Sequence, residues 1–161
     1  MTRALDAITG LGVGAIFAPR FTAQLASVYG QAGRADEGLA VLGMSPDRGP
    51  GRRRVRFGEI FRIEGDLHLL KALPDPGLAE QCYQVAVQIA IGDEAKGWQL
   101  RAALSLAKLW VAQSRIDEAR DLLQALYDSF TEGFAMPDLV EAKQLLQAIE
   151  VGTERRAGVS T

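Results

Sequence analysis

Apolar residues recur along most of this chain at spacings of three and four, the period of a helix with one buried face. Two stripes show this pattern clearly, and they consist of Phe21, Leu25, Val28 and Tyr29 and of Leu100, Leu104, Ala107 and Val111. No segment alternates apolar and polar residues with the period of two that marks a strand. The pattern therefore predicts an all-α protein.

Segments rich in glycine, proline and polar residues separate the apolar stripes and predict turns between short helices. They lie at residues 30–34, 45–51, 73–77, 91–97, 113–115 and 131–137. This spacing predicts helix pairs whose first helices cover 19–31, 55–72 and 97–113. We also expect an opening helix at about 3–13 and a final helix from Pro137 to Glu150, because proline and Asp138 suit a helix start.

The second helices of the three pairs begin with similar sequences. Each carries a small residue at the same point, Gly38, Ala79 or Ala119, and these lie 41 and then 40 residues apart. A recurrence near 40 residues is typical of helical repeats, in which neighbouring helix pairs cover each other's apolar faces. Small side chains suit these points because a bulky one would hold the paired helices apart.

Several of these residues resemble the tetratricopeptide repeat. Leu25-Ala26-x-x-Tyr29, then Gly33 and Asp36-Glu37-Gly38, match its pattern, although the period exceeds the usual 34 residues or so. The middle unit also has about two extra residues between Gly65 and Ala79. The resemblance implies a tetratricopeptide-like array of antiparallel helix hairpins, a right-handed α-solenoid, with a C-terminal capping helix.

A narrower resemblance covers residues 57–149 strongly and 4–43 more loosely. Residues 97–110, 115–123 and 130–146 resemble the C-terminal helical-repeat region of large bacterial signalling regulators of the adenylate/guanylate cyclase or ATPase type. The cyclase and ATPase motifs lie outside this chain, so their activities do not transfer to it. The resemblance implies a non-catalytic protein–protein interaction or regulatory module. The alternative is a structural spacer or oligomerisation segment without a dedicated ligand groove.

The resemblance fails at residues 45–56, where the chain has the proline, glycine and arginine run SPDRGPGRRRVR. We expect a flexible insert at 45–55 within one domain covering 1–150, followed by a disordered tail at 151–161. Arg52–Arg54 could contact phosphate, but a single short run makes few contacts. GLGVGA at 10–15 matches a dinucleotide pattern without the strand that such a loop requires.

Charge and cysteine content limit the partners and the compartment. With 18 basic and 20 acidic side chains, the formal net charge is −2, which attracts neither nucleic acid nor an anionic membrane. No run of about 18 uncharged apolar residues is present. The single cysteine excludes an internal disulfide and fits a reducing compartment. We therefore expect a cytoplasmic protein with no nucleic-acid partner and no membrane partner. The resemblance implies that the protein is bacterial and has a protein or peptide partner.

The residue types that usually carry chemistry are scarce. His68 and Cys82 are the only histidine and the only cysteine, so neither a metal cluster nor a Cys/His dyad is expected. We expect both to pack within helices, and we expect no enzymatic activity, no cofactor and no metal. A third interpretation, a small hydrolase, requires His68 beside an acid or a nucleophile in a pocket.

Polar stripes on the first helices are the candidate binding residues. They are Arg20, Ser27 and Gln31, then Glu59, Arg62 and Asp66, then Arg101, Ser105 and Lys108. First helices line the concave groove of tetratricopeptide arrays, so the resemblance implies that these side chains face a partner. A solvated helix face is the alternative.

The ends of the array predict self-association. The final helix can turn Leu139, Ala142, Leu146 and Ile149 inward, with Asp138, Glu141, Gln144, Gln147 and Glu150 outside. The N-terminal end has no such cap. Its apolar residues include Leu5, Ile8, Phe17 and Phe21. We therefore expect a homodimer joined through residues 4–28.

Overall fold

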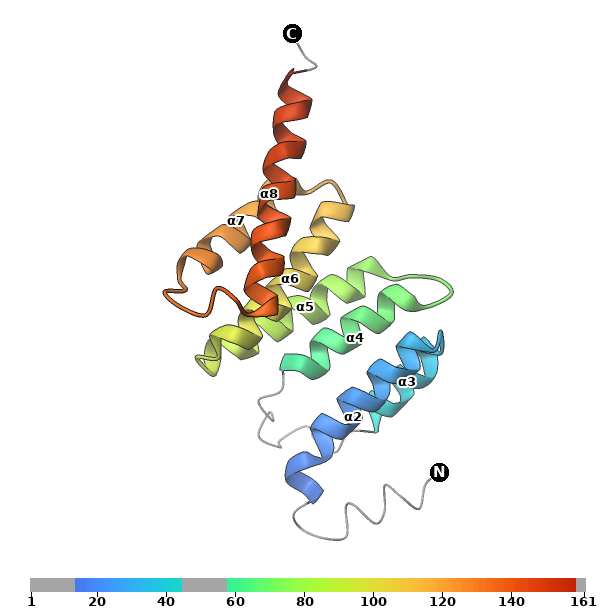
Figure 1. The fold of residues 1–161 in the computed structure, drawn as a ribbon. Helices are drawn as coiled ribbons and strands as arrows, with labels where there is room; N and C mark the ends of the chain where they lie inside the picture. Colours follow the sequence, from blue (N-terminus) through green and yellow to red (C-terminus); the bar gives the residue numbers. More distant parts are fainter. Residues whose placement is uncertain (1–13, 45–57, 159–161) are drawn as a thin grey trace.

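The computed structural model describes residues 14–44 and 58–158, and within them every regular element is an α-helix (Figure 1). The helices are α2 (Gly14–Gln31), α3 (Ala35–Gly43), α4 (Gly58–Leu70), α5 (Pro76–Gly92), α6 (Lys96–Ala112), α7 (Ile116–Asp128) and α8 (Pro137–Gly158). The prediction of an all-α protein is confirmed. The expected helix at 3–13 and the whole insert at 45–56 lie outside the described residues.

The helices are arranged so that each packs against its neighbours in sequence. Along one side, α2, α4, α6 and α8 also form a row in which each helix contacts the next. The intervening helices α3, α5 and α7 pack against this row, and the chain progresses from α2 at one end to α8 at the other (Figure 1). Among the described helices, none combines the length and the apolar character that a membrane-spanning segment needs.

Helix α8 is longer than the sequence predicts. It continues to Gly158 instead of ending at Glu150, so most of the segment expected to be a disordered tail is helical. The apolar stripe ends at Ile149, but no proline or turn sequence follows it before Gly158. The hydroxyl of Thr153 donates a hydrogen bond to the carbonyl of Ile149 at 2.9 Å, one helical turn back.

A left-handed residue ends the first helix of two pairs. Gly33 has a φ of 71° and Ser114 has a φ of 64°, and such a residue allows the chain to turn directly into the next helix. The following N–H groups then reach back: Arg34 N donates to the Tyr29 carbonyl at 2.9 Å and Arg115 N to the Trp110 carbonyl at 2.8 Å. The predicted turns at 30–34 and 113–115 are confirmed.

The side chains at these two turns make the same contacts. The guanidinium of Arg34 lies 4.8 Å from the centre of the Tyr29 ring and pairs with Glu37. Arg115 lies 4.8 Å from the centre of the Trp110 ring and pairs with Glu118 at 2.6 Å. The aromatic residue and the arginine are five positions apart in both pairs. The first and third helix pairs therefore share a local structure as well as a sequence pattern.

The small residues predicted at the helix contacts are buried. Ala79 and Ala119 are fully buried, and a Cβ at Gly38 would lie 2.9 Å from the Ala26 carbonyl oxygen of α2. Another glycine is as constrained, because a Cβ at Gly65 of α4 would lie 2.5 Å from the Tyr83 ring of α5. Glycine at 65 thus lets α4 and α5 approach closely with a buried tyrosine between them.

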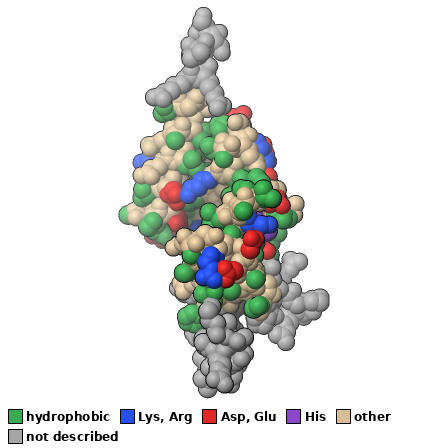
Figure 2. All heavy atoms as spheres, turned by 90° about the vertical axis from the view of Figure 1, so that its right-hand side faces the viewer, with side chains coloured by type: hydrophobic (Ala, Val, Ile, Leu, Met, Phe, Trp, Pro, Cys, Tyr) green, Lys and Arg blue, Asp and Glu red, His purple; other side chains and the backbone are tan. Residues whose placement is uncertain are grey.

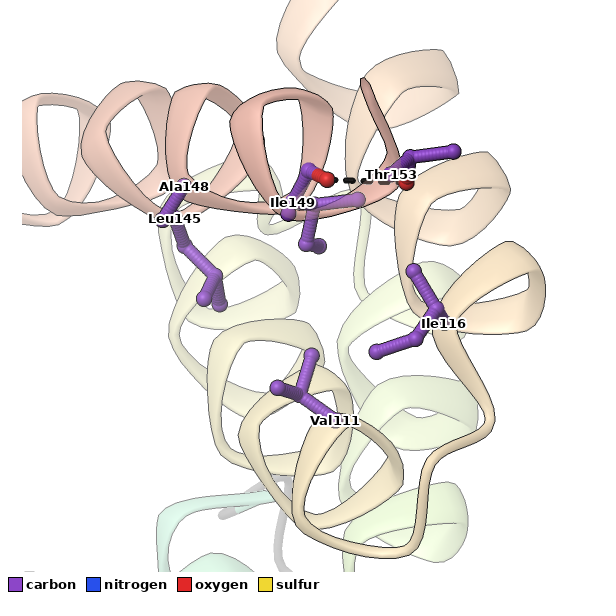
Figure 3. Close-up of a pocket in the computed structure, with 7 residues that line it drawn as sticks. Val111, Ile116, Leu145, Ala148, Ile149 and Thr153 are labelled. Carbon is purple, nitrogen blue, oxygen red and sulfur yellow. Dashed lines mark hydrogen bonds between the residues drawn. The ribbon is translucent and has the colours of Figure 1, made fainter. Parts of the chain in front are cut away.

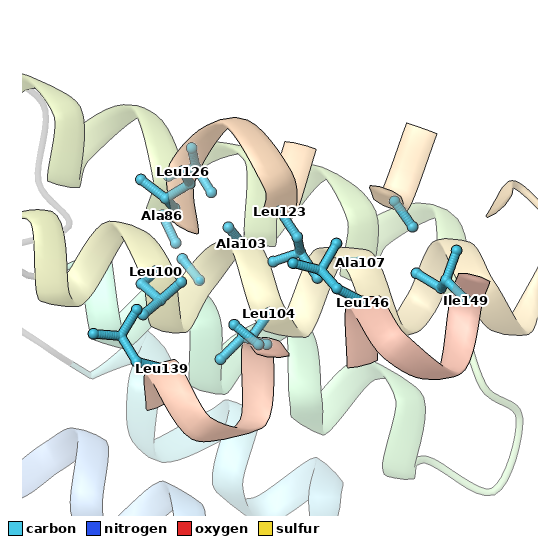
Figure 4. Close-up of a cluster of buried hydrophobic side chains, with 14 residues drawn as sticks. Ala86, Leu100, Ala103, Leu104, Ala107, Leu123, Leu126, Leu139, Leu146 and Ile149 are labelled. Carbon is cyan, nitrogen blue, oxygen red and sulfur yellow. The ribbon is translucent and has the colours of Figure 1, made fainter. Parts of the chain in front are cut away.

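Helix α8 closes the largest apolar cluster. Its inward residues Leu139, Ala142, Leu146 and Ile149 are all buried, as predicted for a capping helix. They meet Leu100, Leu104 and Ala107 of α6 and Leu123 of α7 (Figure 4). Full burial of a leucine or isoleucine stabilises a fold by about 1.5–3 kcal/mol. This cluster fixes α8 beside α6, and so fixes the polar residues on the outer side of both helices.

Candidate binding groove

Arg62 lies at the centre of the polar stripe on α4. Its guanidinium donates two hydrogen bonds to Glu59, at 2.9 and 2.7 Å, and one to Asp66 Oδ2 at 2.7 Å. Spacings of three and four residues place these three side chains on one face of the helix. The two-bond contact with Glu59 fixes the plane of the guanidinium.

Burial and ion pairing compete in setting the pKa of Arg62. Burial lowers that pKa, but the hydrogen bonds with Glu59 and the charges of Asp66 and Glu59 outweigh it, so the pKa lies above its ordinary value. Asp66 also accepts a hydrogen bond from the Tyr83 hydroxyl at 2.7 Å. Burial, and then the charge of Asp66, raises the pKa of Tyr83. Tyr83 therefore stays neutral and ties α5 to the polar face of α4.

Two ion pairs join the polar stripe of α6 to α8. Arg101 donates to Asp138 Oδ2 at 2.8 Å, and Lys108 donates to Glu141 Oε1 at 2.6 Å. The Arg101 guanidinium also lies 5.0 Å from the centre of the Trp98 ring. The sequence assigned Asp138 and Glu141 to the outside of a cap; the structure turns them toward the basic residues of α6.

These residues surround a hollow of about 360 Å³, which we call the α4–α6–α8 groove. It is lined by Glu59, Arg62, Arg101, Leu104, Ser105, Lys108, Asp138 and Glu141. Seven of these eight side chains are polar. Both signs of charge alternate across the groove, and Figure 2 shows basic and acidic side chains next to each other on one face of the molecule as well.

The structure brings together five of the nine predicted groove residues. Asp66 anchors Arg62 without lining the groove, and neither Ser27 nor Gln31 of α2 is among the lining residues. The side chain of Arg20 lies outside the described part of the chain. The sequence did not indicate that Asp138 and Glu141 belong to the groove, although their negative charge complements that of Arg101 and Lys108 on α6.

No protein-family model matches the chain, and comparisons with curated proteins and with solved structures find no match. The functional argument therefore rests on the geometry of the chain itself.

A second hollow, of about 210 Å³, is apolar and lies between α6, α7 and α8. Figure 3 shows Val111, Ile116 and Leu145 pointing toward one another across it. The hydroxyl of Thr153 already donates its hydrogen bond to the Ile149 carbonyl, so this hollow offers few groups for hydrogen bonding to a ligand. It differs from the groove in offering apolar contact alone.

His68 and Cys82 lie close together, contrary to the expectation that neither would join a cluster. A ligand atom from each, and one from Glu64, all lie within 4.8 Å of one another, and all three residues are half-buried. The hydrolase interpretation required an acid or nucleophile near His68, and both are present. None of the three lines either of the hollows described above.

The residues predicted to mediate self-association are described only in part. Phe21 is 56% exposed on α2. The side chain of Phe17, together with Leu5 and Ile8, lies outside the described residues. Arg52–Arg54 also lie outside them. The predicted homodimer therefore stays a prediction.

Proposed function

We propose that this chain is a tetratricopeptide-like, right-handed array of helix hairpins that binds a protein or peptide partner in the α4–α6–α8 groove. It acts without catalysis, as a regulatory module of a bacterial nucleotide-cyclase or ATPase-type signalling protein in the cytoplasm. The observation that carries the proposal is the groove, in which three helices far apart in sequence present seven polar side chains to one hollow.

The repeated turn contacts support the array. Arg34 and Arg115 stack on an aromatic ring of the preceding helix and pair with a glutamate three residues later. In the middle pair, Asp75 occupies the corresponding place, where its N–H donates to the His68 carbonyl at 3.0 Å and its side chain caps α5. His68 and Asp75 are seven positions apart because of the two extra residues. Two equivalent turns, and the Asp75 contact at the third, favour a repeated hairpin.

The mixed charge of the groove favours an extended peptide that carries both signs. Lys108 and Glu141 are about half exposed, so a partner can exchange this internal pair for pairs of its own. Exposed pairs of this kind contribute little to stability, and so their exchange costs little. Complementary charges then set the register and orientation of the partner rather than supplying most of the affinity.

The spacer interpretation has one observation in its favour. Arg62, Arg101 and Lys108 are each paired within the chain, so the groove is already neutralised. A structural segment whose polar face only links neighbouring helices would show the same pairs. The experiment must therefore change the charge pattern of the groove without removing any pair.

Peptides selected from a random displayed library against the wild-type chain distinguish the two functions. The groove variant exchanges one pair, Lys108→Glu with Glu141→Lys, and thereby keeps the ion pair and the net charge. The control exchanges the exposed pair of α7, Asp117→Arg with Arg120→Asp, whose atoms are 2.9 Å apart. We expect selected peptides to bind the groove variant at least about tenfold more weakly, which is 1.4 kcal/mol, and the control normally.

Equal binding to the wild type and both variants would place the peptide site elsewhere and contradict the groove. If no peptide is enriched, the spacer function is favoured. Melting curves of both variants show beforehand whether either exchange disturbs the fold.

A further inference from the structure

Three side chains with metal-binding chemistry meet where α4 packs against α5. Glu64 and His68 are one turn apart on the same face of α4, and Cys82 approaches from α5. One ligand atom from each lies within 4.8 Å of the other two. Among the described residues, no other group of histidine, cysteine and acidic side chains meets in this way.

The histidine in this group has a buried atom without a hydrogen bond. Nδ1 of His68 is buried and has no partner in the structure. A buried polar atom without a hydrogen bond is unfavourable and is uncommon in folded proteins, and coordination of an ion is one way to satisfy such an atom. Hydrogen bonds within the chain therefore leave Nδ1 of His68 unsatisfied.

The chemistry of the three ligands selects the ion. A thiolate, an imidazole and a carboxylate suit Zn²⁺, whereas Mg²⁺ and Ca²⁺ prefer oxygen ligands. Zinc lies about 2.0–2.3 Å from such ligands, which places ligand atoms of a tetrahedral site roughly 3.5 Å apart. Since the three atoms are already within 4.8 Å, small side-chain rotations bring them to that distance.

We propose that Glu64, His68 and Cys82 bind one Zn²⁺ ion that joins α4 to α5, with water as the fourth ligand. The three residues are half-buried, which leaves solvent access for that water. Asp66, on the same helix, does not belong to the set, because Arg62 and Tyr83 already occupy both of its oxygens. The ion would link α4 and α5, whose connecting turn is longer than those of the other two helix pairs.

The composition of the chain makes this site simple to detect. Because Cys82 is the only cysteine, a sulfur-to-cobalt charge-transfer band in the Co²⁺-loaded chain can arise from no other residue. We expect this band at one Co²⁺ per chain, its loss in Cys82→Ser, and displacement of cobalt by Zn²⁺. We expect His68→Gln and Glu64→Gln to weaken Zn²⁺ binding at least about tenfold, measured by competition with a chromophoric chelator.

The matched control is Glu132→Gln, which removes the same charge from an exposed residue in the loop before α8. It should bind Zn²⁺ like the wild type. Saturating Zn²⁺ should also raise the melting temperature of the wild type and of this control, because an ion that binds only the folded chain stabilises it. It should not raise that of Glu64→Gln.

Three results would overturn the site. The first is the absence of a charge-transfer band at saturating Co²⁺. The second is saturation at half an ion per chain, which would show that two chains share the metal. The third is Zn²⁺ affinity unchanged in Glu64→Gln and His68→Gln, which would place binding at other carboxylates. If Cys82→Ser does not fold, the wild-type band and the Glu64→Gln affinity still decide the question.

Discussion

At the scale of single residues, a missing side chain is as important as a present one. Gly65 lies on α4 where the Tyr83 ring of α5 passes, and Tyr83 in turn bonds to Asp66. The Tyr83 hydroxyl thus reaches Asp66 because residue 65 has no side chain in the path of the ring. The sequence located Gly65 only as one boundary of the two-residue insertion, because a glycine does not indicate which ring will cover it.

Gly65→Ala should therefore destabilise the fold by about 1–3 kcal/mol, since the new methyl group would overlap the Tyr83 ring. Gly97→Ala is the control: it is also helical, and a Cβ there meets nothing within 4 Å. It should be neutral or stabilise by up to about 1 kcal/mol. Urea unfolding of both variants measures the difference. Similar losses in the two would show that Tyr83 does not lie against Gly65.

The Arg115–Glu118 pair gives a prediction about acidity. The hydrogen bonds of Arg115 hold the pKa of the Glu118 carboxyl below its ordinary value. A lowered carboxyl pKa stabilises the folded state above the pKa of the unfolded chain, and this stabilisation is lost as the pH falls through the folded-state pKa. Both side chains are in contact with solvent, so the effect on stability is small, and the pKa itself is the better measurement.

In Arg115→Gln, we expect the Glu118 pKa to rise toward its ordinary value when the carboxyl is titrated by NMR. Lys143→Gln removes the same charge from an exposed position on α8 and should leave that pKa unchanged. A Glu118 pKa that does not respond to Arg115→Gln would exclude the pairing in solution.

At the scale of helices, the close contact within each pair rests on small residues. Ala119 on α7 is fully buried in the same cluster as Leu100, Leu104 and Leu139. Ala119→Leu should destabilise the fold by about 1–3 kcal/mol through overpacking. Ala125→Leu makes the same substitution at an exposed position of the same helix and should change stability by less than about 0.5 kcal/mol. Equal shifts in the urea midpoint would contradict the alignment of the repeats.

The helices themselves could be predicted because their causes are local. Apolar spacing placed α6 within one residue at each end, and the turn at Gly33 followed from its glycine. The extension of α8 to Gly158 could not be predicted from a stripe that stops at Ile149. Ser114 adopts a left-handed φ without being a glycine, so only its place in a polar triplet indicated the turn.

The groove could be predicted only where its residues share one helix. Glu59 and Arg62, or Arg101 and Lys108, follow from helical spacing alone. Their contacts with Asp138 and Glu141 depend on how α8 docks, which the buried cluster behind them determines. The meeting of Glu64, His68 and Cys82 depends in the same way on the register of α5 against α4. Contacts between helices require packing that no single stripe specifies.

At the scale of the whole molecule, the two ends of the row α2, α4, α6 and α8 differ. Helix α8 buries four residues against its neighbours and pairs Asp138 and Glu141 with basic residues of α6, although Val140 and Val151 are 40% and 48% exposed. Helix α2, at the other end, leaves Phe21 56% and Val28 59% exposed, and these are two turns apart on one face. Adjacent exposed apolar side chains favour association.

We therefore expect the chain to dimerise through the face of α2 that carries Phe21 and Val28. Light scattering at tens of micromolar should give a dimer for the wild type and a monomer for Phe21→Glu, because association would bury an unpaired charge. Leu73→Glu is the control, since Leu73 is 84% exposed in the turn between α4 and α5, and it should remain dimeric. If Phe21→Glu and Leu73→Glu have the same mass as the wild type, whether monomeric or dimeric, this face of α2 does not join two chains.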